Sequence, residues 1–186
     1  YHTSANKNDR EGIYQYYCDG TYYYYHIPKT LKNITIKAGN IPYQAFYNCS
    51  NLKTITISDD VTSIGERAFY GCNGLTTVNY NARNCTQMSR SIFSDCYALS
   101  TVNIGDGVEI LPDYAFYDCS SLAEVTIPDS VTSIGDYAFY RCSGMTSLTI
   151  PDSVTTIGDY AFYDCNDLLL VIIGNKVTNV EEGAFS

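Results

Sequence analysis

The sequence is poor in positive charge. Its 186 residues include 11 lysines and arginines but 20 aspartates and glutamates, which gives a net charge of −9 at pH 7. A field of this sign repels the phosphates of nucleic acids and of anionic lipids. We therefore expect no nucleic acid among the partners of this protein.

Long apolar segments and histidines are equally scarce. The longest aliphatic run, Leu168 to Ile173, is far shorter than the ~20 residues that a membrane helix requires, so we expect no insertion into a bilayer. The two histidines, His2 and His26, lie near the N-terminus, and no G-x-S-x-G, Walker or H-E-x-x-H pattern occurs. The sequence thus predicts no enzyme, no metal site and no cofactor.

All phenylalanines of the chain occur at one phase of a tandem repeat. They are separated by 23 residues, except for a spacing of 24 between Phe69 and Phe93. A cysteine follows each of the first six by three positions, and alanine precedes every one except Phe93. The phenylalanines are Phe46, Phe69, Phe93, Phe116, Phe139, Phe162 and Phe185. A fixed period of this length indicates a stacked repeat architecture, with one residue inserted in the turn between Tyr80 and Cys85.

Each repeat contains the pattern L-x-x-V-x-I, as in Leu122, Val125 and Ile127. Such alternation is typical of a half-buried strand, and stacked copies would lie in parallel ~4.8 Å apart. Turn residues follow, and then a short segment Y-A-F-Y-x-C, which we expect to be helical or 3₁₀. The aspartates before this segment, Asp113, Asp136 and Asp159, would be its N-caps. We predict a right-handed repeat solenoid of the leucine-rich-repeat type, with about 23 residues per coil, parallel strands on one face and short helical or 3₁₀ turns and loops on the other.

The segments Ile127 to Cys142 and Ile150 to Cys165 resemble the BspA-like, or Treponema pallidum-type, leucine-rich repeats. Members of that family are mostly surface or secreted proteins of mucosa-associated bacteria, and several are implicated in adhesion. The resemblance implies a non-enzymatic adhesion or ligand-binding module at the cell surface or secreted, with a host-matrix or cell-surface protein as its partner. A structural spacer that presents another domain, and a glycan-binding module, are the alternatives.

The two ends depart from the repeat. Residues 1–25 lack its phase, and we interpret them as an irregular tyrosine-rich segment or a degenerate first coil before a solenoid over residues 26–186. The last coil stops at Ser186, before its expected cysteine and strand, so we interpret it as truncated. Leu169, Leu170 and Ile172 take positions that are polar in other coils, either because a neighbour covers them or because they form an apolar contact patch. We expect a monomer, with end-to-end contacts through the last coil as the alternative.

The phase also bears on the eight cysteines. Six share one repeat position and Cys85 falls where other coils have valine, so we expect an inward row of reduced thiols. Disulfides between neighbouring coils are the alternative, although parallel Cβ vectors resist the required torsion. Cys18 lies outside the row, and its state stays open.

Three outward rows are candidates for recognition. The first is the strand face, nearly uncharged and rich in hydroxyls: Thr54, Thr56, Thr77, Asn79, Thr101, Asn103, Glu124, Thr126, Ser147 and Thr149. The second is an aromatic stripe beside the phenylalanines: Tyr114, Tyr117, Tyr137, Tyr140, Tyr160 and Tyr163. The third is an acidic row, formed by the three aspartates named above and Glu182, as a cation site. Strand propensity, packing between coils and solvated caps explain the same three rows without a ligand.

Overall fold

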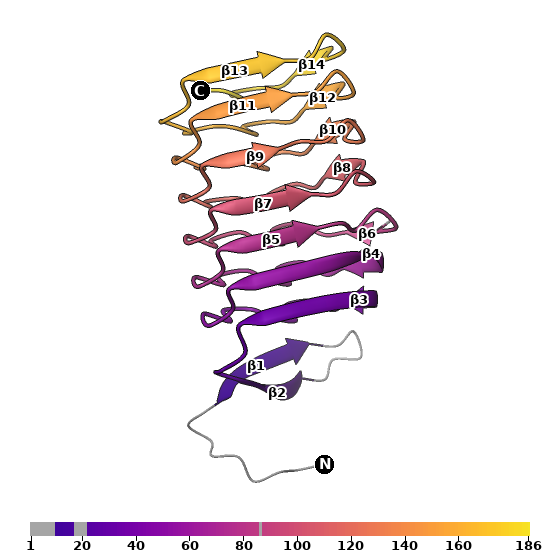
Figure 1. Ribbon diagram of the computed structural model, residues 1–186, viewed down its shortest axis with the longest axis vertical. Helices are drawn as coiled ribbons and strands as arrows, with labels where there is room; N and C mark the ends of the chain where they lie inside the picture. The colour runs from indigo at the N-terminus through magenta and orange to yellow at the C-terminus, as the bar shows by residue number, and fades with distance from the viewer. Residues whose placement is uncertain (1–9, 17–21, 86) are drawn as a thin grey trace.

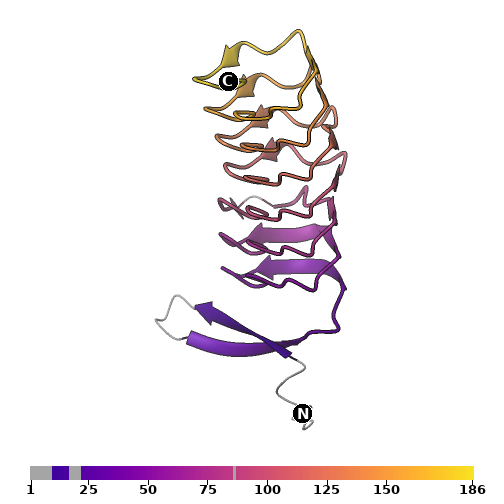
Figure 2. The same cartoon turned by 90° about the vertical axis from the view of Figure 1, so that its left-hand side faces the viewer.

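The computed structural model describes residues 10–16, 22–85 and 87–186, and these form one column of stacked coils that begins with a hairpin (Figures 1 and 2). Cys18 lies outside the described residues. The strands are β1 (Arg10–Tyr16), β2 (Tyr22–Pro28), β3 (Asn33–Ile41), β4 (Thr54–Ile64), β5 (Thr77–Tyr80), β6 (Gln87–Met88), β7 (Thr101–Ile104), β8 (Ile110–Leu111), β9 (Glu124–Thr126), β10 (Ser133–Ile134), β11 (Ser147–Ile150), β12 (Thr156–Ile157), β13 (Leu170–Ile173) and β14 (Asn179–Val180). Strands β1 and β2 pair antiparallel with each other.

The longer strands of successive coils form the predicted parallel face. Strands β3, β4, β5, β7 and β9 pair in this order, and β11 pairs with β13. The register follows the sequence period, since Thr54 faces Thr77 and Thr101 faces Glu124. Valine and isoleucine alternate with polar residues along these strands, so one set of side chains is buried and the other is outward. The prediction of a parallel solenoid with about 23 residues per coil is confirmed.

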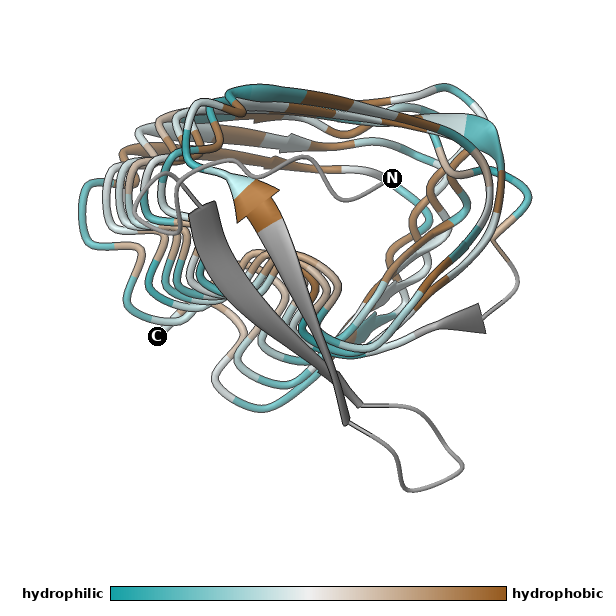
Figure 3. Ribbon diagram, turned by 90° about the horizontal axis from the view of Figure 1, so that it is seen from below, coloured by the Kyte–Doolittle hydropathy of each residue, from teal (hydrophilic) through white to brown (hydrophobic). Residues whose placement is uncertain are grey.

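A second parallel ladder lies along the column beside the first (Figure 1). Its strands are only two residues long, and β8, β10, β12 and β14 pair successively. Strand β6 pairs with β4, with a register one residue longer than that of β5 with β4. This shift confirms that the inserted residue lies in the turn between β5 and β6. Viewed along the column, the coils superpose around a common interior (Figure 3).

The segment around each phenylalanine forms turns, and the described residues contain no helix or 3₁₀ helix, so the helical expectation is wrong. Its N–H groups alternate in direction: Ala115 donates to the carbonyl of Pro112 at 3.2 Å, but Phe116 donates to that of Ala138 in the next coil at 2.8 Å. A helix needs successive bonds within its own segment. The left-handed backbone of Tyr114, with φ of 57°, interrupts it further. Hydrogen bonding between coils therefore replaces helical bonding within a coil.

The repeated aspartates also bond between coils. Oδ1 of Asp113 accepts the backbone N–H of Asp136 at 3.1 Å, and Oδ1 of Asp136 accepts that of Asp159 at 2.9 Å. Oδ1 of Asp159 in turn accepts the N–H of Glu182 at 3.1 Å. The expectation that each aspartate caps its own helical turn is thus wrong. Each aspartate carboxylate instead accepts a hydrogen bond from the backbone of the equivalent residue in the following coil.

The core is a column of identical side chains. The phenylalanine rings stack with centroids 5.2 to 5.6 Å apart, from Phe46 to Phe185. Beside them the predicted row of cysteines is buried, and Cys96, Cys119, Cys142 and Cys165 form no disulfide. Each of these four thiols donates to the carbonyl of a phenylalanine at 3.3 Å, as Cys119 does to Phe93. Burial raises the pKa of Cys119 and Cys142 well above the usual value, so these thiols are inert packing groups.

Candidate functional site

The strand face is flat and outward, as the alternation predicted. Its more exposed members lie on β7, β9 and β11: Thr101, Asn103, Glu124, Thr126, Ser147 and Thr149. The members on β4 and β5 are partly covered: Thr54, Thr56, Thr77 and Asn79. Since equivalent residues pair in register, these side chains form two parallel rows along the column.

Part of this face is already hydrogen-bonded. The amide nitrogen of Asn103 donates to Oδ1 of Asn79 at 2.8 Å, and the amide nitrogen of Asn79 donates to Oγ1 of Thr56 at 3.0 Å. Each bond holds a side chain of one coil against the equivalent position of its neighbour. The polar groups of this row are therefore ordered before any partner arrives.

The strand face becomes aliphatic toward the C-terminus. Leu170 pairs with Ser147 and Ile172 pairs with Thr149 in the register of β11 and β13. Leu169, Leu170 and Ile172 are 88%, 55% and 52% exposed. Leu170 and Ile172 lie on the same outward face as the hydroxyl rows, and Leu169 directly precedes β13, so that face contains both polar and apolar groups.

The tyrosine stripe is present, and it consists of two stacked columns. Tyr114, Tyr137 and Tyr160 stack at 4.8 and 5.2 Å, with interplanar angles of 7° and 21°. Tyr117, Tyr140 and Tyr163 stack at 4.8 and 5.1 Å and are nearly parallel. All six rings are half-buried. Because the rings of each column cover one another's faces, they present mainly edges and hydroxyls to a partner.

Charged groups border this stripe. The Tyr160 hydroxyl donates to Glu182 at 3.0 Å, and the Arg141 guanidinium lies 5.3 Å from the ring centroid of Tyr140 while it pairs with Asp164 at 3.3 Å. The hydrogen bond from the Tyr160 hydroxyl to the Glu182 carboxylate is the main reason that the pKa of Tyr160 is raised. These contacts lie between neighbouring coils and add to the stacking of the column.

The acidic row lacks the geometry of a cation site. One oxygen of Asp113, Asp136 and Asp159 is occupied by a backbone N–H, as described above. Across the described part of the chain, no group of three or more histidine, cysteine, aspartate or glutamate side chains is placed to hold a metal ion. The same part of the chain has no helix with the length and hydrophobicity to cross a membrane.

A seam between two coils, where the second ladder is interrupted, was not predicted from the sequence. Strand β8 pairs with β10 on one side, but β6 on its other side pairs with β4. Pro112 supplies the reason, because it stands where Gly135 and Gly158 donate an N–H to the preceding coil. Ile110, 47% exposed, also lies in the seam, at a position where other coils have a polar residue: Ser63, Gln87, Ser133, Thr156 or Asn179. The signals were in the sequence as the 24-residue spacing and the proline.

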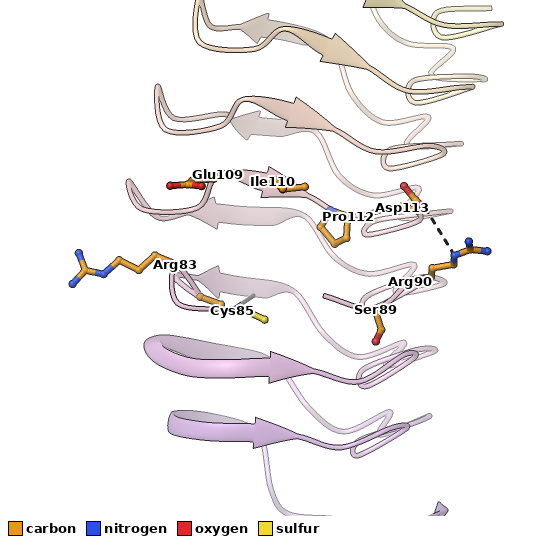
Figure 4. A pocket seen from close by; sticks show the side chains of 9 residues that line it. Arg83, Cys85, Ser89, Arg90, Glu109, Ile110, Pro112 and Asp113 are labelled. Atoms are coloured by element: carbon orange, nitrogen blue, oxygen red, sulfur yellow. Dashed lines mark ion pairs between the residues drawn. The ribbon is translucent and has the colours of Figure 1, made fainter. Parts of the chain in front are cut away.

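A hollow of about 570 Å³ lies at this seam (Figure 4). Ile110 and Pro112 lie at its centre, and the ion pair of Arg90 with Asp113 stands at one end. Arg83 extends from the other end, where a second hollow of about 410 Å³ shares this arginine. The second hollow spans three successive coils, with the inserted turn in the middle, and it is lined by Ser58, Asp59, Asn81, Arg83, Gly105, Asp106 and Gly107.

The stacked coils, parallel strands and repeated core define a solenoid protein of the leucine-rich-repeat class. Residues 20–119 and 86–186 match the model of the BspA type leucine rich repeat region, in six copies, and the chain belongs to this family. Comparison with curated protein sequences gives no match.

Solved structures support the same fold. A leucine-rich repeat protein of T. pallidum superposes with a TM-score of 0.73 at 22% identity, covering 95% of this chain and 86% of that one. A leucine-rich repeat protein of Bacteroides ovatus gives 0.73 at 27% identity, with 86% and 46% covered. A leucine rich cell surface protein of Faecalibacterium prausnitzii gives 0.59 at 28% identity, with 92% and 54% covered. This chain thus spans about half the length of the latter two proteins.

Proposed function

We propose that this chain is a non-enzymatic binding module of a cell-surface or secreted protein, and that its strand face binds a partner protein such as a host-matrix or cell-surface protein. The observation that carries the proposal is the exposed, nearly neutral row of polar side chains on β7, β9 and β11, which begins at Asn103, where a hydrogen bond to Asn79 orders the side chain. The similarity to a leucine rich cell surface protein supports the location. Family membership supports a protein-interaction role, since solenoids of this class offer extended binding surfaces.

An ordered, nearly neutral face favours short-range contacts. Side chains that are fixed in advance lose little conformational entropy on binding. The rows of threonine and asparagine offer hydroxyl and amide groups, and Leu170 and Ile172 add apolar area at one end. Affinity should therefore depend weakly on salt, because screening acts on charges over a Debye length of ~8 Å at physiological ionic strength.

The test is a surface-binding titration of the chain against extracellular-matrix proteins and mucin at low and moderate ionic strength. We expect a partner whose affinity changes little with salt and is lost in the variant T101K/T126K. Thr155→Lys is the matched control, because Thr155 is an exposed threonine next to β12, outside the strand face. A steep salt dependence, binding confined to polycations, or equal loss in the control would show that the strand face is not the contact surface.

A structural spacer is the second candidate function, and the unbroken stack of phenylalanine rings favours it. A spacer would keep cell attachment unchanged in the double lysine variant.

We also propose that residues 1–25 cap a solenoid over residues 26–186, because β1 and β2 pair only with each other among the described strands. Ile27 packs against the core at that end.

A further inference from the structure

We propose a second binding site, for a neutral pyranose unit of a glycan, in the two neighbouring hollows that share Arg83. We call this site the Arg83 seam. The site consists of the polar hollow around Arg83, Asn81, Asp59 and Asp106 and continues past Arg83 toward Ile110. The polar hollow begins where the strand face ends, since Asn81 directly follows β5 and Gly105 directly follows β7. The proposal for this hollow is independent of the proposed protein-binding function.

Two glycines let polar side chains of this hollow pack closely against the next coil, as Gly135 and Gly158 do elsewhere in the column. A Cβ on Gly107 would lie 2.6 Å from the side-chain carbons of Arg83, and one on Gly105 would lie 2.4 Å from Oδ1 of Asn81. Neither glycine has a positive φ, whereas Gly71 and Gly183 do. The backbone therefore does not demand glycine at 105 and 107. The absence of Cβ atoms lets Asn81 and Arg83 pack closely against the next coil.

The charges of the hollow exclude several ligand classes. Arg83 pairs with Asp59 at 3.2 Å, and Asp106 adds a second carboxylate, so the lining carries a net negative charge. Phosphates and acidic peptides are disfavoured by this charge and by the −9 of the whole chain. A metal ion is disfavoured by the guanidinium in the same hollow. A wholly apolar ligand lacks a matching surface in the polar hollow, whose side chains are aspartate, asparagine, serine and arginine.

A neutral polyol is the ligand class that these charges favour. Carboxylate and amide oxygens accept hydrogen bonds from neighbouring sugar hydroxyls, and the guanidinium donates to hydroxyl or ring oxygens in a fixed planar fork. Past Arg83, the side chains of Ile110 and Pro112 give an apolar floor for the less polar side of a second sugar ring (Figure 4). The two hollows are each within the range of known small-ligand sites.

The tyrosine stripe is a weaker candidate for the same ligand. Sugars bind aromatic residues through exposed ring faces, but Tyr137 and Tyr140 each lie between two stacked rings. The Arg83 seam is therefore a better candidate for a glycan-binding site than the tyrosine stripe.

The experiment is saturation-transfer NMR and a binding titration of the full chain with cellohexaose, mannohexaose and lacto-N-tetraose, with sialyllactose and a tri-aspartate peptide as acidic probes. We expect binding of at least one neutral oligosaccharide and a loss of about tenfold or more in affinity in Arg83→Gln and in Asp106→Asn. Gly107→Ala should weaken binding as well, because its new methyl group displaces the stem of Arg83.

Asp129→Asn is the matched control, because Asp129 occupies the equivalent turn of the next coil and does not line either hollow. It should bind like the unaltered chain, as should T101K/T126K. Thermal unfolding of each variant separates loss of binding from loss of fold. Absence of binding by all three neutral oligosaccharides, a preference for the acidic probes, or affinity that is equal in Arg83→Gln and the unaltered chain would overturn the proposal. None of these outcomes affects the strand-face proposal.

Discussion

Replacing Phe139 with alanine tests the inward phase on which the whole fold rests. Phe139 has no exposed surface, and its ring stacks between Phe116 at 5.3 Å and Phe162 at 5.2 Å. The substitution leaves a cavity inside the column, for which roughly 3–5 kcal/mol of unfolding free energy is the usual loss. This is a large share of the ~5–15 kcal/mol that stabilises a typical domain.

The neighbouring residue provides the matched comparison. Tyr140 also stacks between two rings, at 4.8 and 5.1 Å, but it is only half-buried. Tyr140→Ala should cost less, roughly 1–3 kcal/mol, the order of the two aromatic pairs that it loses. Phe185→Ala should also cost less than Phe139→Ala, because Phe185 is 36% exposed in the last coil.

Urea denaturation followed by circular dichroism measures these differences, and native-state hydrogen exchange shows whether the loss is local to one coil. The second measurement is needed because stacked repeats unfold with imperfect cooperativity. Equal destabilisation by Phe139→Ala and Tyr140→Ala would refute the reasoning, since it would mean that the two positions are equally buried.

Three further predictions concern the thiols, the aspartates and the tyrosines. Alkylation in denaturant without reductant should modify Cys96, Cys119, Cys142 and Cys165 completely. Cys165 should react slowly in the native chain, because burial raises its pKa to about 12. Disulfides found at these positions by mass spectrometry would contradict this prediction. Asp136→Ala should lower the free energy of unfolding by ~1 kcal/mol in a urea titration, whereas Asp136→Asn, which retains Oδ1, should leave it nearly unchanged. Equal losses in the two variants would contradict a stabilising hydrogen bond from the backbone N–H of Asp159 to Oδ1 of Asp136. The hydrogen bond to Asp95 raises the pKa of Tyr70 from 10.0 to about 12. The contribution of this bond to the free energy of unfolding is therefore complete below pH 10 and should fall as the pH rises toward 12. Asp95→Asn should lower the pKa of Tyr70 in an ultraviolet titration.

The inward half of each coil was predictable because it repeats. Every position that meets its own copy in the next coil must have a shape that stacks on itself, so Phe139 and Cys142 recur with the period. The spacing of 24 after Phe69 placed the insertion in the correct turn for the same reason. Burial, strand direction and register thus followed from the period alone.

The turns were not predictable in this way. A segment such as Asp136 to Cys142 has a plausible cap and plausible helix formers, which local rules read as a helical turn. Local rules do not include the carbonyl of Ala161 in the next coil, to which Phe139 donates at 2.7 Å. The bonds between coils decided the conformation, and only the stacked structure contains them.

The strand face is also clearer once its internal bonds are known. Asn79 uses its amide both to donate to Thr56 and to accept from Asn103, so part of its hydrogen-bonding capacity is already used. The more exposed hydroxyls lie farther along, at Thr101 and Thr126. We therefore expect a protein partner to obtain most of its affinity from β7 onward, where exposed hydroxyls adjoin the aliphatic residues of β13. The period identified the rows, but exposure and internal bonding determine which part of each row remains available to a partner.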